Sequence, residues 1–225
     1  MPLILHHCAD ARSFRPLWTL EEMGLPYELR MLPFPPRAAA PDYLARNPLG
    51  TIPLLEDGEH RMTESAAICH YLASRHGPSS LNVAPEEPGY AAFLNGLHFG
   101  EATLTFPQTL VLRYRRLEPP ERRLPQVAED YERWFLSRLR KGLEMMTGDF
   151  YAAGRFTAAD ISIGYALLLA VRLGLDGQFT DRARDYWARL SARPGYRRAR
   201  EAQQAALARQ QVPPTDFAAP GGTSA

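Results

Sequence analysis

The sequence predicts an α/β domain at the N-terminus followed by an all-helical domain. Short apolar runs and amphipathic segments alternate over the first third of the chain, a polar and Pro-rich stretch follows, and the remainder shows helical periodicity without a strand pattern. A chain of 225 residues is long enough to bury two such cores. We therefore expect an α/β domain at residues 1–77, a linker at 78–88, a helical domain at 89–212 and a loose tail at 213–225.

The first three elements of the α/β domain read as strand, helix and strand. Leu3–His7 is a short apolar run with strand character. Ser13 can cap a helix over residues 14–23, and Gly24 suits the left-handed position just past its end. Apolar side chains then alternate over residues 27–31, as they do in a strand.

A Pro-rich connection over residues 32–47, with one expected helical turn, leads to a hairpin and a helix. A short apolar strand opens at Pro53, Asp57-Gly58 is a strong two-residue turn signal, and an amphipathic helix starts at Ser65. The resulting order of elements, β-α-β, connection and β-β-α, is that of the thioredoxin-like fold.

Helical patterns fill the second domain. The expected helices cover residues 90–112, 126–147, 157–173, 181–192 and 195–211. The first of them should bend near Pro107, and the third is the most apolar and should be the central buried helix. Thr157 and Asp160 have the spacing of a capping box, with Asp in place of Glu. We expect a buried, hydrogen-bonded Asp160 with a structural role.

Composition narrows the function classes. The formal net charge is +1, from 26 basic and 25 acidic residues, so no bulk field favours nucleic acid or an anionic membrane. The longest apolar stretch, residues 165–171, is too short to span a bilayer, and the N-terminus lacks the basic region of a signal peptide. Two cysteines, Cys8 and Cys69, form neither a CxxC pair nor a disulfide framework. We expect a cytoplasmic protein without nucleic-acid or membrane partners.

The segment from Ile52 to Ser65 predicts a binding site. Pro53 cannot donate to a strand ladder, and a bend there leaves the N–H and C=O of Ile52 open to an extended peptide. The helix that begins at Ser65 offers free N–H groups to a carboxylate, and Glu64 can accept hydrogen bonds from an ammonium group. Peptide backbone, carboxylate and ammonium together describe a small peptide with a free amino acid end.

This arrangement resembles the glutathione-binding half of the cytosolic glutathione transferases, and the resemblance extends over most of the chain. Five strings carry it in the order that the family has them, the third in a bacterial and fungal subgroup: SFRPLWTLEEMGLPYEL, GTIPLL with a following ES, LHFGEATL, GRFTAADISIGY and RPGYRRA. The resemblance implies the two-domain glutathione transferase fold. It also implies glutathione as co-substrate, a small hydrophobic electrophile as the second substrate, and no metal.

The same resemblance assigns roles to residues of the binding segment. It implies that Ile52, Pro53, Glu64 and Ser65 bind glutathione, and that Thr51 faces its glycine end, where many relatives carry Lys or another polar residue. It further implies a homodimer in which the thioredoxin-like domain of one subunit pairs with the helical domain of the other. The helix at Ser65 and the helix over residues 90–112 are the candidate surfaces.

The group that activates the glutathione thiol is less clear from the residues. Relatives often read SRSxR before the first helix, whereas this chain has Ala11 at the place of the first Ser and Arg12 at the place of the Cys used by some classes. The remaining donors are Ser13, the Arg12 guanidinium and nearby backbone N–H groups. We expect Ser13 and Arg12 to stabilise the thiolate, with two alternatives open: Ser13 is only a helix cap, and Arg12 is only solvated.

Two other functions remain open at this point. Cys8 could form a mixed disulfide with glutathione, which would make the protein a glutathione-dependent peroxidase or disulfide reductase. The missing hydroxyl at Ala11 also leaves room for a non-enzymatic glutathione-binding protein. His6, His7 and Cys8 do not predict a metal site, because adjacent strand residues point to opposite faces and no HExxH or CxxC pair is present.

A pocket for the electrophile is implied on the first helix of the helical domain. His98 and Glu101 stand three residues apart and share a helix face, and Tyr114 lies further along. In relatives this face borders the electrophile site, so the resemblance implies that these three side chains line it. The alternative is an ordinary polar pair on the helix surface or a dimer contact.

Overall fold

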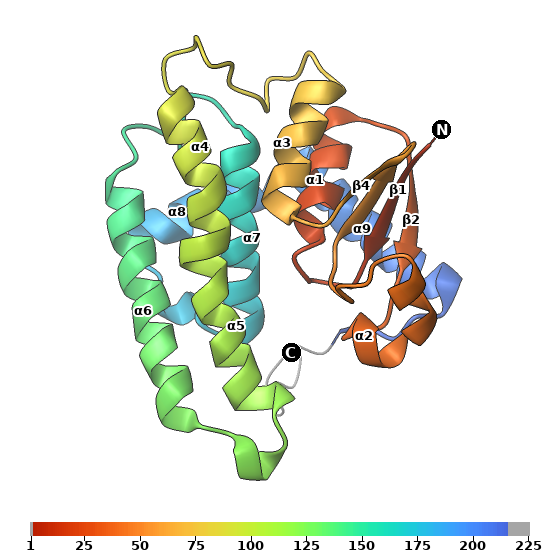
Figure 1. Ribbon diagram of the computed structural model, residues 1–225. Helices are drawn as coiled ribbons and strands as arrows, with labels where there is room; N and C mark the ends of the chain where they lie inside the picture. The colour runs from red at the N-terminus through yellow and green to blue at the C-terminus, as the bar shows by residue number, and fades with distance from the viewer. Residues whose placement is uncertain (1, 216–225) are drawn as a thin grey trace. The chain divides into compact units, whose positions relative to one another are not determined.

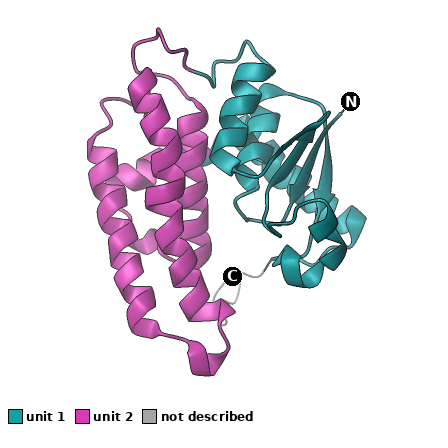
Figure 2. Ribbon diagram, in the orientation of Figure 1, with its two compact units in different colours: residues 1–82, 191–215 teal, residues 83–190, 216–225 magenta. Residues whose placement is uncertain are grey.

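The computed structural model describes residues 2–215, which form two compact units (Figure 1, Figure 2). The first unit contains residues 2–82 and 191–215, and the second contains residues 83–190. The last helix of the described residues therefore belongs to the same unit as the N-terminal sheet. Of the tail expected at residues 213–225, residues 216–225 lie outside the described part.

The first unit is built on a four-stranded sheet with the strand order β2-β1-β3-β4. β1 pairs in parallel with β2 and antiparallel with β3, which pairs antiparallel with β4. This is the thioredoxin-like arrangement that the sequence predicts. Its elements are β1 (Leu3–His7), α1 (Phe14–Met23), β2 (Tyr27–Met31), α2 (Pro36–Ala39), a 3-10 turn (Pro41–Ala45), β3 (Leu54–Asp57), β4 (His60–Met62), α3 (Ser65–Arg75) and α9 (Pro194–Gln210).

Two details of the first unit differ from the sequence-based expectation. The short helix α2 forms within the Pro-rich connection, where only one turn was expected. The hairpin turn is Gly58-Glu59, because Asp57 is still paired with His60 across the two strands. Gly58 has a φ of 60°, which a glycine adopts without strain, and the first central position of this kind of turn requires it.

α9 covers two parts of the first unit. It packs along α1, where the Tyr196 ring lies edge-on to Trp18 with centroids 5.1 Å apart. At its C-terminal end Gln210 Nε2 donates to Leu29 O (2.7 Å), and Met31 N donates to Gln210 Oε1 (2.9 Å). β2 is the outer strand of the sheet. One amide side chain thus pairs with its open edge, as a neighbouring strand would.

The second unit is all helical. Its elements are α4 (Tyr90–His98), a π-helix (Phe99–Thr105), α5 (Phe106–Leu112), a second π-helix (Arg113–Leu117), a 3-10 turn (Pro120–Arg122), α6 (Pro125–Glu144), α7 (Ala158–Leu173), a 3-10 turn (Asp176–Gln178) and α8 (Asp181–Ser191), the last of which ends at the boundary of the first unit. α7 is buried along nearly its whole length, as expected of the central helix. Within residues 2–215, no helix combines the length and apolar character that a membrane crossing needs.

The capping box that opens α7 is confirmed. Thr157 Oγ1 accepts from Ala159 N (3.3 Å), and Thr157 N donates to Asp160 Oδ2 (2.8 Å). The other carboxylate oxygen of Asp160 accepts from Tyr151 N (2.8 Å) and from the Tyr186 hydroxyl (2.7 Å). Asp160 is fully buried, so its bonds stabilise the start of α7 and its role is structural.

The helix expected over residues 90–112 is wound differently. Its middle, Phe99–Thr105, is π-helical. The hydrogen-bond pattern therefore changes before Pro107 and not at Pro107 itself. Pro107 lacks an N–H and its ring crowds the carbonyl of the preceding turn, which a wider turn relieves. Gly100 lies so close to Ser162 of α7 that any side chain at position 100 would collide with it. The tight approach to α7 and the proline together favour the π-helix.

Candidate functional site

The sheet topology gathers the predicted site residues of the first unit at one edge of the sheet. β1 runs antiparallel to β3 with His6 opposite Leu54, so the β1–α1 loop (residues 8–13) and the residues just before β3 lie at the same edge. β4 ends there too, because Met62 pairs with Leu55, and α3 begins three residues later. A direct bond joins the two helix starts: Arg15 Nη1 of α1 donates to Ser65 Oγ of α3 (3.0 Å).

The segment before β3 leaves backbone groups open. The Ile52-Pro53 peptide bond is cis, and Ile52 is half-buried. The Thr51 carbonyl accepts from the Tyr43 hydroxyl and from Asn47 Nδ2, both at 2.8 Å, and this pair of bonds fixes the approach to the strand. Among residues 2–215, no hydrogen bond involves the N–H or C=O of Ile52. Both groups are therefore available to an extended peptide.

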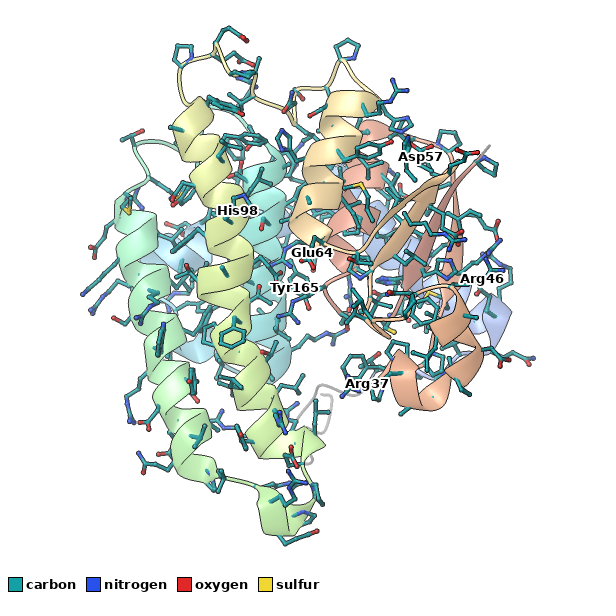
Figure 3. The ribbon with its side chains drawn as sticks, viewed as in Figure 1. Arg37, Arg46, Asp57, Glu64, His98 and Tyr165 are labelled. Atoms are coloured by element: carbon teal, nitrogen blue, oxygen red, sulfur yellow. The ribbon has the colours of Figure 1, made fainter. Side chains whose placement is uncertain are left out.

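The start of α3 presents a negative carboxylate next to the free N–H groups of the helix terminus. The Glu64 carboxylate is exposed at the beginning of the helix (Figure 3) and has no hydrogen-bond or ion-pair partner within the described residues. Ser65 is the first residue of α3, and no side chain caps this end of the helix. Because Arg15 donates to the Ser65 oxygen, the hydroxyl proton of Ser65 remains free to donate outward. The site thus offers donors to a carboxylate beside an acceptor for an ammonium group.

Arg15 is a site residue that was not predicted from the sequence. The side chain is completely buried in the first turn of α1, and it brings a permanent positive charge directly behind Ser65. One signal was available in the sequence: a basic residue stands among the apolar positions that α1 was expected to bury. A buried guanidinium needs acceptors, and Ser65 supplies one of them.

The β1–α1 loop is held by a buried network that reaches α9. Gln203 Oε1 accepts from Asp10 N (3.0 Å) and Gln203 Nε2 donates to Asp10 Oδ1 (3.0 Å). Gln203 Oε1 also lies 2.9 Å from His7 Nε2, and His7 Nδ1 lies 2.7 Å from Ser13 Oγ. Arg200 of α9 pairs with the Asp10 carboxylate as well. His7, Asp10, Ser13 and Gln203 are all buried, so the network excludes water from the inner side of the loop.

The hydrogen-bond pattern assigns the protons in this network. A backbone N–H can only donate, so the amide of Gln203 must present its oxygen to Asp10 N and to His7 Nε2. His7 therefore carries its proton on Nε2, and Nδ1 accepts the hydroxyl proton of Ser13. Burial lowers the pKa of His7 from 6.5 to about 4, which keeps the ring neutral.

This assignment bears on the expected role of Ser13. Its one hydroxyl proton points to His7 Nδ1 at 2.7 Å rather than to the more distant Cys8 O at 3.4 Å, and its oxygen also accepts from Cys8 N (3.2 Å). Ser13 precedes α1, yet its side chain makes no capping bond to the helix. The geometry thus argues against Ser13 as a direct thiol donor and also against the helix-cap alternative. Arg12, the other candidate, is the one half-exposed side chain of the loop.

Both cysteines are buried and unpaired. The Cys8 thiol donates to Pro33 O (3.6 Å), and burial raises the pKa of Cys8 to about 12. A thiol with such a pKa is almost entirely protonated near pH 7, and the thiolate is the nucleophile in disulfide exchange. Cys69 is buried within α3, and burial raises its pKa to about 12 as well. This environment does not favour the reductase alternative that relies on Cys8.

His6 and His7 point to opposite faces of the sheet, as expected for adjacent strand residues. His6 Nε2 lies 2.6 Å from Glu56 Oε1 on one face, and His7 meets Ser13 and Gln203 on the other. Across the described residues, His, Cys, Asp and Glu side chains form no group of three or more that could hold a metal ion.

The residues implied for the electrophile lie in the second unit. His98 is exposed near the end of α4 (Figure 3), and Glu101 is half-buried in the π-helix Phe99–Thr105. Hydrogen bonds in a π-helix run from i to i+5, so His98 and Glu101 lie further apart around the helix than they would in an α-helix. Tyr114 lies in the second π-helix, with the Arg113 guanidinium 5.5 Å from its ring centre. The chain advances roughly 20 Å along the helix between His98 and Tyr114, too far for one small molecule to touch both.

Comparisons with known proteins agree on one family. The family model described as glutathione S-transferase, N-terminal domain, matches residues 11–75. Glutathione S-transferase 3 of Schizosaccharomyces pombe is 34% identical over 102 residues, which cover 45% of this chain and 42% of that protein. Glutathione S-transferase hmp2 of Hypomyces subiculosus is 31% identical over 147 residues, which cover 60% of this chain and 69% of that protein. The match to the yeast protein thus spans less than half of its length.

A solved structure with the same fold accounts for nearly the whole chain. The glutathione transferase URE2P6 of Phanerochaete chrysosporium, solved in complex with oxidized glutathione, superposes with a TM-score of 0.77. The two sequences are 24% identical, and the match covers 91% of this chain and 97% of the fungal one.

Proposed function

Because this chain belongs to the glutathione S-transferase family, we propose that it binds glutathione at the sheet edge and joins its thiol to small hydrophobic electrophiles. The single observation that carries the proposal is that the open backbone groups of Ile52 and the uncapped start of α3 lie at the same edge of the sheet. These groups fit the three polar features of glutathione: its cysteinyl backbone, its γ-glutamyl carboxylate and its ammonium group.

Each polar feature of glutathione has a proposed partner. The cysteinyl backbone pairs with Ile52 beyond the cis bond to Pro53, as an added strand would. The γ-glutamyl carboxylate accepts from the Ser65 N–H and hydroxyl, with the buried Arg15 charge behind them. The ammonium group donates to Glu64. The exposed Thr51 stands at the glycine end of the ligand, where its hydroxyl gives a weaker contact than a charged side chain would.

Conjugation requires the thiolate of glutathione. The sulfur attacks the electrophilic carbon with an electron pair, the displaced group leaves with its own pair, and the thiol proton passes to solvent. A shift of two pKa units in the thiol needs about 2.7 kcal/mol of preferential stabilisation of the thiolate. We assign this stabilisation to the Arg12 guanidinium and the N-terminal end of α1, while Ser13 acts only through the conformation of the loop.

Thiolate absorbance against pH, recorded on the bound glutathione, tests this assignment. Wild type should titrate well below the free thiol, and Arg12→Ala should raise the pKa of the bound thiol by one unit or so. Ser13→Ala should shift it less, and Ala11→Ser serves as a control that restores the hydroxyl found in relatives. A larger shift for Ser13→Ala than for Arg12→Ala would return the donor role to Ser13.

Two competing functions give different results in the same assays. A non-enzymatic glutathione-binding protein would be retained on immobilised glutathione, but its bound thiol would titrate like free glutathione. A reductase would turn over a disulfide substrate and lose that activity with Cys8→Ser. We expect turnover of a generic aromatic halide and no effect of Cys8→Ser, because Cys8 is buried and protonated.

For the electrophile we propose contacts with His98 and Glu101, which lie within one turn of the same helix. His98→Ala and Glu101→Ala should change kcat/KM for the electrophile and leave the KM for glutathione unchanged. Tyr114→Ala should affect only long electrophiles, because Tyr114 lies far along the helix.

We also propose that the protein works as a homodimer in the cytoplasm. The proposed dimer surfaces are α3 and the helix from α4 to α5, and two unpaired cysteines fit a reducing compartment. One chain has a mass of 25.3 kDa, so light scattering at micromolar protein should give about twice that value. A mass of one chain would rule out the dimer.

A further inference from the structure

The C-terminal helix α9 inserts a polar side chain into the β1–α1 loop. Gln203 is fully buried, and its amide makes three contacts there: with Asp10 N, with Asp10 Oδ1 and with His7 Nε2. These contacts are 2.9–3.0 Å long, and they join the last helix of the first unit to the loop that precedes its first helix.

We propose that Gln203, His7 and Asp10 are positioning residues that fix the β1–α1 loop so that Arg12 and the first amides of α1 face the glutathione sulfur. This inference rests on the proposed function, since it assigns a task to residues that touch neither substrate. It makes the C-terminal helix part of the catalytic site without contact to the ligand.

The backbone of Asp10 shows why the loop needs such support. Asp10 has a φ of 55°, in the left-handed region that residues other than glycine seldom adopt. Such a conformation persists only where surrounding contacts over-determine it. Here the Asp10 N–H donates to Gln203, and the Asp10 carboxylate receives both Gln203 Nε2 and Arg200. The turn that carries Arg12 is therefore set by α9.

The rest of the network transmits this position to the start of α1. Gln203 fixes the proton of His7 on Nε2, and His7 Nδ1 then holds the hydroxyl of Ser13 (2.7 Å). Ser13 is the residue that precedes α1 and follows Arg12. Ala11 and Ser13 are buried while Arg12 remains half-exposed between them. Fixing both neighbours leaves Arg12 little freedom in its backbone.

The chemistry of position 203 supports a role beyond packing. α9 already packs against α1 through apolar and aromatic side chains, and an apolar residue at position 203 would fill the same space. Burying polar groups costs desolvation free energy that an apolar core does not. Both the oxygen and the nitrogen of the Gln203 amide have hydrogen-bond partners, which offset this cost. The match is to one loop conformation, and another conformation would leave the amide unpaired.

The test compares Gln203→Met, which keeps the volume of the side chain but none of its hydrogen bonds, with Gln204→Ala, a change on the exposed face of the same helix. We expect Gln203→Met to raise the pKa of the bound glutathione thiol by about half a unit or more and to lower kcat several-fold. Glutathione affinity should change less than about three-fold, because Ile52 and Ser65 are untouched. Gln204→Ala should leave all three values at wild type.

The double variant Arg12→Ala/Gln203→Met decides whether Gln203 acts through Arg12. If it does, the thiol pKa of the double variant equals that of Arg12→Ala alone. Additive shifts, or a Gln203→Met protein that is less stable but keeps the wild-type thiol pKa, would overturn the proposal. A wild-type complex that titrates like free glutathione would overturn the proposed activation itself, which is a different result.

Asp10 provides a second route if Gln203→Met fails to fold. Asp10→Gly adopts the positive φ without strain but loses the carboxylate, so it should fold and raise the thiol pKa as Gln203→Met does. Asp10→Asn keeps both the tolerance of this backbone conformation and an oxygen that accepts from Gln203, so it should restore near-wild-type titration. Equal thiol pKa values in Asp10→Gly and Asp10→Asn would contradict the proposal.

Discussion

Residues 51–53 and the β1–α1 loop reach the same edge of the sheet, but they use their polar groups in opposite ways. The first segment fixes the carbonyl of Thr51 with two bonds and leaves both backbone groups of Ile52 open. The loop binds His7, Asp10 and Ser13 into a closed network with α9. We call residues 51–53 and the start of α3 the open side of the site, because their polar groups are available to a ligand. The β1–α1 loop is the closed side, because its polar groups fix its own conformation. A binding site needs both, because open donors select a ligand only when their support does not move.

The largest expected effect is on protein stability, which should depend on pH through His7 on the closed side. Burial lowers the pKa of His7 from 6.5 to about 4, with Asp10 raising it and Arg200 lowering it further. Between these two pH values the unfolded chain binds a proton at His7 that the folded chain does not. The free energy of unfolding therefore loses nothing through His7 above pH 6.5, and it falls as the pH drops from 6.5 towards 4. A shift of about 2.5 units corresponds to roughly 3 kcal/mol.

Urea unfolding at pH 7.5 and pH 4.5 measures this loss. His7→Gln has no titrating ring, so its stability should fall less than that of wild type over the same interval. Other groups titrate in both proteins, which makes the difference between them the relevant quantity. Equal losses would mean that the loop side is not closed around a neutral histidine.

On the open side we expect a substitution to change the affinity for glutathione. Ser65→Ala removes a hydroxyl that we expect to bond a carboxylate, a contact of about 1.5–3 kcal/mol, so glutathione affinity should fall ten-fold or more. Ser74→Ala makes the same chemical change near the other end of α3, where the hydroxyl bonds only the His70 carbonyl. Calorimetric titration should find wild-type affinity for Ser74→Ala. An unchanged Kd in Ser65→Ala would remove Ser65 from the site.

The capping box of α7 is a control from the other unit. Thr157→Ala removes the side-chain acceptor for Ala159 N and should cost about 0.5–2 kcal/mol of stability. Thr157→Ser keeps the hydroxyl and should recover most of it. Glutathione affinity measured on the folded proteins should stay at wild type in both, since neither loop of the first unit is touched. A loss of affinity would show that the two units are energetically coupled.

The smallest expected effect is at Thr51. Its side chain is exposed and lies 3.4 Å from Asn47 Nδ2, while the carbonyl of the same residue makes the shorter bonds. Thr51→Val should therefore change stability by no more than about 0.5 kcal/mol. Its glutathione affinity should stay within three-fold of wild type in the same titration. A ten-fold loss would give the hydroxyl a stronger ligand contact than we assign.

The open side could be predicted from the sequence because its signals are local. A proline at the mouth of a strand and a Glu-Ser pair at a helix start lie within one short segment. The bounds of β1 and α1 were also predictable, since β1 is a continuous apolar run and Gly24 marks the end of α1. The hairpin was displaced by one residue because only the backbone reveals which of two neighbouring residues takes the positive φ.

The closed side could not be predicted, because its partners come from distant parts of the chain. Nothing near Ser13 indicates that its proton belongs to His7, or that a glutamine of α9 determines which ring nitrogen accepts it. Arg15 was overlooked for the same reason, since its partner Ser65 lies on another helix. The π-helix depends on the contact between Gly100 and α7 and on Pro107, so periodicity within one helix does not reveal it.

The place of α9 in the first unit has a consequence for how the protein is made. A ribosome releases residues 2–82 early, yet the helix that pairs with the edge of β2 and closes the β1–α1 loop emerges only after residues 83–190. At synthesis rates of roughly 5–20 residues per second, the intervening residues 83–190 impose a delay of roughly 5–20 s. During that interval the nascent sheet exposes its β2 edge, and we expect chaperones to bind it there until α9 has emerged.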